Sequence, residues 1–179
     1  MTTVRSRFSL LRAGGALLAL CLASLSSAGN VEPLSGSAPD IISDTWLNSA
    51  PKTIAALRGK VVLVEFWTFE CWNCHNVEPY IKQWHARYRD AGLEVITVHA
   101  PEFERERDVK NVRAYVDKAG INYAVVIDND FANWNRYRNR FWPTIYLIDK
   151  HGKLRHIKIG EGDYAGTERK IQALLREAE

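Results

Sequence analysis

An apolar run that ends in two closely spaced cysteines constrains this chain more than any other feature. Residues 61–67 read Val-Val-Leu-Val-Glu-Phe-Trp, which predicts a strand buried on both faces. Cys71 and Cys74 follow, and from His75 onward apolar residues recur at the three- and four-residue steps of a helix. A helix N-terminus presents unpaired N–H groups and a positive dipole end, so it stabilises a thiolate. We therefore expect reversible thiol–disulfide exchange between Cys71 and Cys74.

The first 28 residues have the pattern of a secretory signal peptide. Three arginines precede a short apolar stretch over residues 13–25, and Ser26-Ser27-Ala28 fits a signal-peptidase site. The apolar stretch is shorter than the ~20 residues that span a bilayer, and an uncleaved N-terminal anchor is the alternative. We predict a signal peptide over 1–28, a linker rich in Ser, Gly and Pro over 29–40, and a folded domain over 41–179.

Removal of this leader changes both the charge and the cysteine count. The whole chain has 24 basic and 21 acidic residues, and the leader holds three of the arginines and no acid. The mature domain is therefore close to neutral, which gives no support for nucleic acid as a partner. Cys21 leaves with the leader, so only Cys71 and Cys74 remain and no disulfide framework holds the fold. We expect a periplasmic or otherwise exported monomer with an ordinary hydrophobic core.

After the cysteines the chain alternates between strand and helix patterns. A turn sequence at residues 149–152 separates the last two strands, and Thr167 has the residue type of a helix N-cap for a final helix that ends at Ala178. This order predicts an α/β fold with a central mixed sheet flanked by helices. The further strands are expected at 94–100, 123–127, 144–148 and 154–159, and the helices at 75–90, 107–119 and 131–138.

The strand–Cys-x-x-Cys–helix unit resembles the thioredoxin superfamily. Pro79 matches the proline that kinks the first helix of that family, and the segment 141–144, Phe-Trp-Pro-Thr, resembles its cis-proline loop. The helix and strand between Arg107 and Ile127 resemble the insertion of exported TlpA-like members. The chain is also similar to the thioredoxin-like domain of DipZ-type membrane reductases, and we expect it to act as a free module. That similarity is carried by residues 66–68, 98–102, 137–143 and 155–164.

The resemblance implies a thiol–disulfide oxidoreductase that uses no metal or organic cofactor. Cys71 would attack a protein disulfide, and Cys74 would resolve the mixed disulfide. Glu65 would correspond to the buried acid of the family and exchange a proton with Cys74; in the simpler interpretation it is a strand-end residue that faces solvent. The expected partners are protein substrates and a membrane-bound or soluble redox partner. The residues expected to contact substrate are Trp72, Trp142, Pro143 and Thr144.

Other interpretations of the same residues stay open at this point. Cys71, Cys74 and His75 match the attachment pattern for c-type haem, although the only methionine, Met1, leaves with the leader. Thr68 and Cys71 resemble half of a peroxiredoxin-type thiol peroxidase site, but a valine stands where its upstream proline is expected. A structural zinc site would need four protein ligands, and a second cysteine pair is absent. A non-catalytic thioredoxin-like binding module with a permanent disulfide is the remaining alternative.

Overall fold

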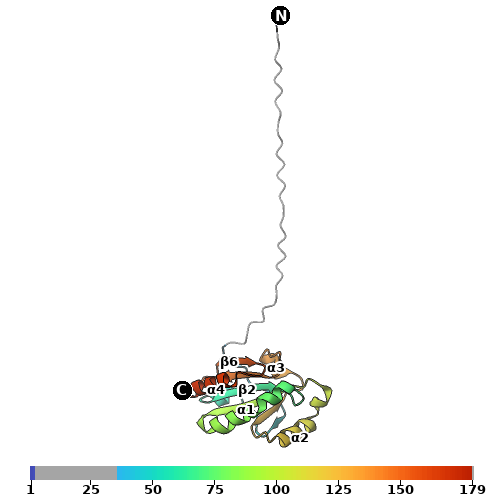
Figure 1. The fold of residues 1–179 in the computed structure, drawn as a ribbon, viewed down its shortest axis with the longest axis vertical. Helices are drawn as coiled ribbons and strands as arrows, with labels where there is room; N and C mark the ends of the chain where they lie inside the picture. Colours follow the sequence, from blue (N-terminus) through green and yellow to red (C-terminus); the bar gives the residue numbers. More distant parts are fainter. Residues whose placement is uncertain (3–35, 179) are drawn as a thin grey trace. The chain divides into compact units, whose positions relative to one another are not determined.

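The computed structural model describes residues 1–2 and 36–178, over which strands and helices alternate largely as predicted (Figure 1). The strands are β1 (Trp46–Leu47), β2 (Val61–Trp67), β3 (Leu93–His99), β4 (Ala124–Ile127), β5 (Thr144–Ile148) and β6 (Leu154–Ile159). The α-helices are α1 (Trp72–Tyr88), α2 (Val109–Ala119), α3 (Ala132–Arg136) and α4 (Tyr164–Arg176). Short 3-10 helices are η1 (Ala55–Leu57), η2 (Arg89–Ala91) and η3 (Glu104–Arg107).

The six strands form one mixed sheet in the order β1-β4-β3-β2-β5-β6. β2, β3 and β4 run parallel to one another, whereas β1, β5 and β6 are antiparallel to their neighbours. The predicted insertion contributes α2 and β4, and β4 adds to the sheet beside β3. The α/β architecture with a central mixed sheet is therefore confirmed.

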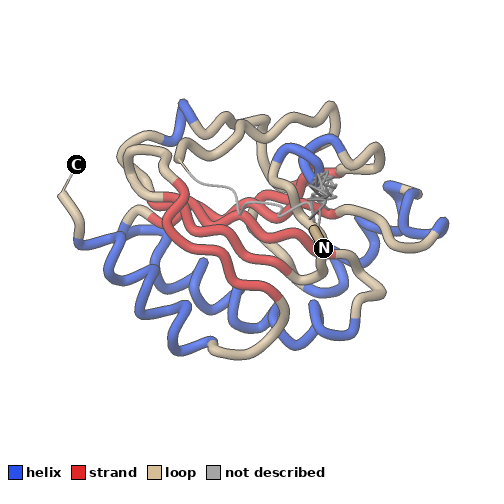
Figure 2. Tube along the Cα trace, turned by 90° about the horizontal axis from the view of Figure 1, so that it is seen from above, coloured by secondary structure: helices blue, strands red, loops and turns tan. Residues whose placement is uncertain are grey.

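β2 lies in the interior of this sheet, and all seven of its residues are buried. Because side chains alternate along a strand, Leu63 and Trp67 face one side and Val64 and Phe66 face the other. Helices α1, α2 and α4 cover the first side, and the longer helices gather there in Figure 2. The other side is covered by residues near α3 and by the segment that contains η1. A strand covered on both faces explains why its sequence is an almost continuous apolar run.

Helix α1 begins three residues earlier than its apolar pattern indicates. Cys71 is the N-cap: its backbone is extended, and its sulfur accepts a hydrogen bond from the N–H of Cys74 at 3.2 Å. Cysteine is outside the usual set of capping residues, so sequence reasoning placed the first turn too late. At the other end, Gly92 adopts a left-handed conformation with φ of 99° and ends η2, which continues α1.

Residues 36–40 lie against the domain, although the sequence pattern assigned them to the linker. Ser37 forms a β-bridge with Lys153, and the N–H of Ala38 donates to the carbonyl of Gly152 at 2.9 Å. The predicted signal peptide and residues 29–35 lie outside the described residues. Within the part of the chain that the structure describes, none of the helices has the length and apolar character needed to cross a membrane.

The predicted cap of the last helix is wrong. α4 begins at Tyr164, after Asp163 in a left-handed conformation, and Thr167 lies inside the first turn. The side chain of Thr167 is buried, and its hydroxyl has no hydrogen-bond partner among the described residues. Thr167 therefore packs into the core instead of capping the helix.

This placement predicts that Thr167→Val increases stability. Valine has nearly the same shape and removes a buried hydroxyl that lacks a partner, so the free energy of unfolding should rise by about 1 kcal/mol. Loss of a true N-cap would instead lower it by about 1 kcal/mol. Urea unfolding distinguishes the two outcomes. As a matched control, Thr167→Ser keeps the hydroxyl, loses a buried methyl group and should lower stability by about 1 kcal/mol.

Candidate active site at the junction of β2 and α1

Cys71 and Cys74 lie where β2 ends and α1 begins, and they form a disulfide. Cys71 is 9% exposed and Cys74 is 3% exposed, so Cys71 is the more accessible of the pair. The sulfur of Cys71 already accepts an N–H bond from the first turn of α1. After reduction, that donor and the positive end of the helix would stabilise a thiolate at Cys71. The geometry therefore makes the two cysteines chemically unequal, with Cys71 as the outer one.

The segment before β5 lies next to the cysteines because β5 pairs with β2. Thr144 is opposite Phe66 in this ladder, and the Trp142–Pro143 peptide bond is cis. The indole N–H of Trp142 donates to the carbonyl of Ala100 at 3.0 Å, which attaches the segment to the end of β3. The hydroxyl of Thr144 donates to the carbonyl of Phe141 at 2.8 Å and is buried.

An open groove of about 430 Å³ runs beside Cys71. Trp72 and Trp142 line it, and Trp72 is 76% exposed, as expected for a contact residue. Pro143 and Thr144, which the sequence grouped with them, are buried and do not line the groove. The residues that line it are Glu70, Cys71, Trp72, Asn73, Glu102, Phe103, Arg140, Phe141 and Trp142.

Glu65 is buried in the core behind the disulfide and does not face solvent. It is 3% exposed and lies on the same face of β2 as Leu63 and Trp67. The apolar cluster on this face includes Cys71 and Cys74. Burial raises the pKa of Glu65 to about 8, because the carboxylate loses hydration, and the negative charge of Glu78 adds to the effect. The site thus contains an acid that titrates near neutral pH.

Glu78 places a second carboxylate on α1, one helical turn beyond Cys74. One of its oxygens accepts from the ammonium of Lys82 at 2.6 Å, and the other accepts from the hydroxyl of Tyr115 at 2.7 Å. These two bonds hold Glu78 in place at the edge of the core. Its fixed negative charge opposes ionisation of Glu65.

Stacked rings support the loop between β2 and Cys71. The ring of Phe69 stacks with those of His99 and Tyr115, and Tyr115 also stacks on His75. The Nε2 atom of His75 is 2.7 Å from the carbonyl oxygen of Phe69. Nε2 of His99 is 3.1 Å from the hydroxyl of Thr68, and both side chains are fully buried. Burial lowers the pKa of His99 to about 4, with the charge of Glu106 acting in the opposite direction, so this imidazole is neutral at neutral pH.

Sequence reasoning missed Glu106, whose side chain is fully buried beside the same loop. Its carboxylate accepts hydrogen bonds from the backbone N–H groups of Glu70, Glu102 and Phe103, at 2.9, 2.6 and 2.8 Å. In the sequence it belongs to a run of alternating charges, which is typical of an exposed surface. The spacing of a capping box gave no signal either, because the residue three positions earlier is Phe103, which has no side-chain acceptor.

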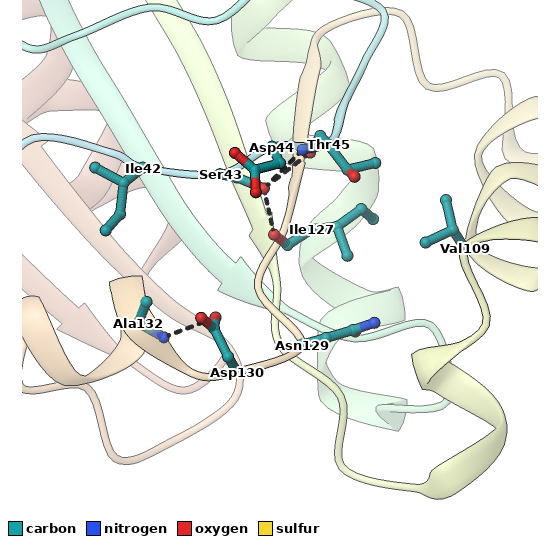
Figure 3. Close-up of a pocket in the computed structure, with 9 residues that line it drawn as sticks. All are labelled: Ile42, Ser43, Asp44, Thr45, Val109, Ile127, Asn129, Asp130 and Ala132. Carbon is teal, nitrogen blue, oxygen red and sulfur yellow. Dashed lines mark hydrogen bonds between the residues drawn. The ribbon is translucent and has the colours of Figure 1, made fainter.

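A second cavity, of about 350 Å³, lies at the β1–β4 edge of the sheet (Figure 3). Ser43 donates from its hydroxyl to the carbonyl of Ile127 at 2.7 Å, and Asp130 accepts from the N–H of Ala132 at 3.2 Å. The lining contains no cysteine or histidine. Over the described residues, no group of three or more His, Cys, Asp or Glu side chains is arranged to hold a metal ion.

Comparisons with known proteins agree with this geometry. Residues 36–157 match the AhpC/TSA family. The chain is 46% identical over 147 residues to Protein DipZ of Mycobacterium bovis. The aligned residues make up 80% of this chain but only about a fifth (21%) of the length of DipZ. It is 28% identical over 134 residues to the thiol-disulfide oxidoreductase YkuV of Bacillus subtilis, covering 75% of this chain and 90% of YkuV. A solved thioredoxin-like superfamily protein matches with a TM-score of 0.74 and 27% identity, covering 80% and 99% of the two chains. The predicted thioredoxin-like fold and the resemblance to DipZ-type domains are confirmed.

The raised pKa of Glu65 predicts a specific dependence of stability on pH. Between its unfolded value of 4.5 and its folded value of about 8, the folded state holds a proton that the unfolded state releases. Stability must therefore fall as pH rises through this window, by up to about 1.4 kcal/mol per pH unit. Glu65→Gln removes this contribution. The free energy of unfolding of the variant, compared with that of wild type, should therefore increase from pH 5 to pH 8.

Urea unfolding of the oxidised proteins at several pH values measures this difference. Glu104→Gln is the matched control, because its side chain is 92% exposed and its profile should run parallel to that of wild type. Parallel profiles for Glu65→Gln and wild type would contradict the assignment of a raised pKa to Glu65.

Proposed function

The chain belongs to the AhpC/TSA family, and we propose that it is an exported thiol–disulfide oxidoreductase that exchanges disulfides with protein substrates. The observation that carries the proposal is the Cys71–Cys74 disulfide at the N-cap of α1. The named activity of YkuV, which this chain covers over 90% of its length, supports the assignment. Cys71 lines the open groove, and a protein segment would approach it there.

In the reductive direction, the Cys71 thiolate attacks one sulfur of a substrate disulfide. A bond forms between Cys71 and that sulfur, the substrate disulfide breaks, and the second substrate sulfur leaves as a thiolate. Cys74 then loses its proton and attacks the sulfur of Cys71, which expels the first substrate sulfur. The substrate gains two electrons and the cysteine pair loses two, and the same steps in reverse oxidise a substrate dithiol.

We assign to Glu65 the role of accepting the proton that the Cys74 thiol loses. It lies in the same apolar cluster as both cysteines, and its pKa of about 8 allows it to hold and release a proton near neutral pH. Cys74 is almost fully buried, so its thiol needs an internal base to become a nucleophile.

The substrate segment would bind in the groove between the first turn of α1 and the loop before β5. Trp72 and Trp142 would supply apolar contact on its two sides. Pro143 and Thr144 are buried, so we assign them to shaping the loop and its backbone groups. The substrates would be protein thiols and disulfides, and a membrane-bound or soluble redox partner would return the cysteine pair to its working state.

Export is proposed from the sequence of residues 1–28, with its basic start, apolar stretch and Ser26-Ser27-Ala28 site. An oxidising compartment such as the periplasm is also where exchange between protein disulfides is required. We propose that the mature protein is a monomer that acts there.

The contacts of the residues next to the cysteines favour thiol–disulfide exchange over haem attachment and over a thiol peroxidase reaction. His75, the histidine of the haem-attachment pattern, stacks on Tyr115 and has its Nε2 atom against the carbonyl of Phe69. Thr68, the threonine of the peroxidase pattern, is buried with its hydroxyl against His99. A non-catalytic binding module would need neither a buried acid of raised pKa nor a cysteine that lines an open groove.

The unequal cysteines predict different outcomes for their serine variants. Cys71→Ser should abolish insulin reduction, because the attacking sulfur is lost. Cys74→Ser should accumulate a mixed disulfide between Cys71 and the substrate, visible on non-reducing gels and by mass spectrometry. In the reduced wild type, iodoacetamide should label Cys71 first. Faster labelling of Cys74 would reverse the assigned roles. Insulin reduction by Cys71→Ser would refute the role of Cys71 as the attacking residue.

The role of Glu65 predicts a change in the pH profile of the resolving step. Release of the mixed disulfide by wild type should accelerate as pH rises towards 8, where the carboxylate becomes available as a base. Glu65→Gln should be slower there and should lack this inflection. Rapid mixing followed by acid quench gives the release rate. Identical profiles for the two proteins would remove Glu65 from the mechanism while leaving the roles of the cysteines intact.

A further inference from the structure

Glu106 connects two segments that lie on opposite sides of Cys71 in the sequence. One oxygen, Oε1, accepts the N–H of Glu70, the residue immediately before Cys71. The other, Oε2, accepts the N–H groups of Glu102 and Phe103, which follow β3. A single buried carboxylate thus joins the cysteine loop to the turn that contains η3. Bonds from N–H groups to a carboxylate are charge-assisted and are stronger than those to neutral acceptors.

The segment held in this way forms one wall of the groove. Glu102 and Phe103 line the groove together with Cys71 and Trp72. Phe103 is 51% exposed even though it is a large apolar residue, and Trp72 and Phe141 in the same groove are also exposed. Among the described residues, half of the exposed large apolar side chains lie in this groove; the complete set is Met1, Ile42, Trp72, Phe103, Phe141 and Ile159. Such a concentration beside a reactive sulfur fits contact with a polypeptide.

A partly buried ion pair links the same two segments a second time. The guanidinium of Arg105 pairs with the carboxylate of Glu70, and the side chain of Arg105 is 71% exposed. The side chain of Glu70 is only 15% exposed, but the pair ends on an exposed guanidinium, whereas Glu106 is fully buried and holds three backbone N–H groups, so we assign the larger share of the connection to Glu106. The position of Phe103 relative to Cys71 therefore depends mainly on Glu106.

We propose that Glu106 is a positioning residue that holds the η3 turn against the Cys71 loop and so fixes the wall of the groove on which a substrate polypeptide docks. The inference rests on the proposed exchange function and adds a determinant of substrate class. A polypeptide disulfide needs both Cys71 and the wall, whereas a small disulfide needs only access to Cys71. Glu106 should therefore favour polypeptide substrates without contacting them.

Glutamine at position 106 tests the connection at nearly constant shape. Its single carbonyl oxygen can replace only one of the two carboxylate oxygens. Its amide N–H groups would then face the N–H of Glu70, or those of Glu102 and Phe103, and two donors cannot bond to each other. Glu106→Gln should consequently release one segment from the other. Glu104→Gln makes the same chemical change in the same turn, on a side chain that is 92% exposed.

The experiment compares the rates at which the reduced proteins are oxidised by insulin and by bis(2-hydroxyethyl) disulfide. The ratio of the two rate constants cancels any change in Cys71 reactivity or in the folded fraction. For Glu106→Gln we expect this ratio to fall about tenfold relative to wild type, the size expected when one charge-assisted hydrogen bond is lost. Glu104→Gln should keep the wild-type ratio.

Phe103→Ala provides a second test that does not depend on the folding of Glu106→Gln, because its side chain is half exposed. It should lower the same ratio. An unchanged ratio in folded Glu106→Gln, or in Phe103→Ala, would overturn the inference and leave the exchange function standing. A reduced wild-type protein that neither disulfide oxidises would overturn the proposed function, and this inference with it.

Discussion

The capping of α1 by Cys71 is the interaction around which the site is organised. β2 carries the chain through the core and ends at Trp67, and the first turn of α1 must then satisfy its N–H groups without help from another turn. The sulfur of Cys71 accepts one of these N–H groups. The atom that begins the helix is therefore also the atom that would react, and the unpaired donors of the helix start favour a negative charge on it. Fold and chemistry depend on the same contact.

Three buried titratable side chains lie near this junction, and each has a different electrostatic role. Glu65 is isolated in an apolar cluster, so burial dominates and its pKa rises. His99 is also desolvated and stays neutral, which allows it to pack against Thr68 and Phe69. Glu106 is compensated by three N–H donors from the backbone. Burial of a polar group costs free energy unless the group is hydrogen-bonded. Glu65 is therefore suited to proton transfer, and Glu106 is suited to holding the two segments together.

The sequence predicted the parts of the fold that arise from local pattern. β2, β5 and β6 have the bounds that were expected, because continuous or alternating apolar runs between turn residues define them. The start of α1 was misplaced because its N-cap is a cysteine. The cap of α4 was misplaced because the helix begins after Asp163, which adopts a left-handed conformation. Glu106 could not be predicted, because its bond to Glu70 joins residues 36 positions apart and its burial exists only in the folded chain.

The pairing of Ser37 with Lys153 fixes the place where the described chain enters the domain. Lys153 lies just before β6, at the end of the sheet where Ile148 pairs with Val62 near the start of β2, whereas Cys71 follows the opposite end of β2. Seven residues of strand separate the two ends by about 20 Å. The entry point at Ser37 and the two sulfur atoms therefore lie at opposite ends of β2, so the first contact of the domain with the chain before it and its reactive pair are separated by the length of the sheet.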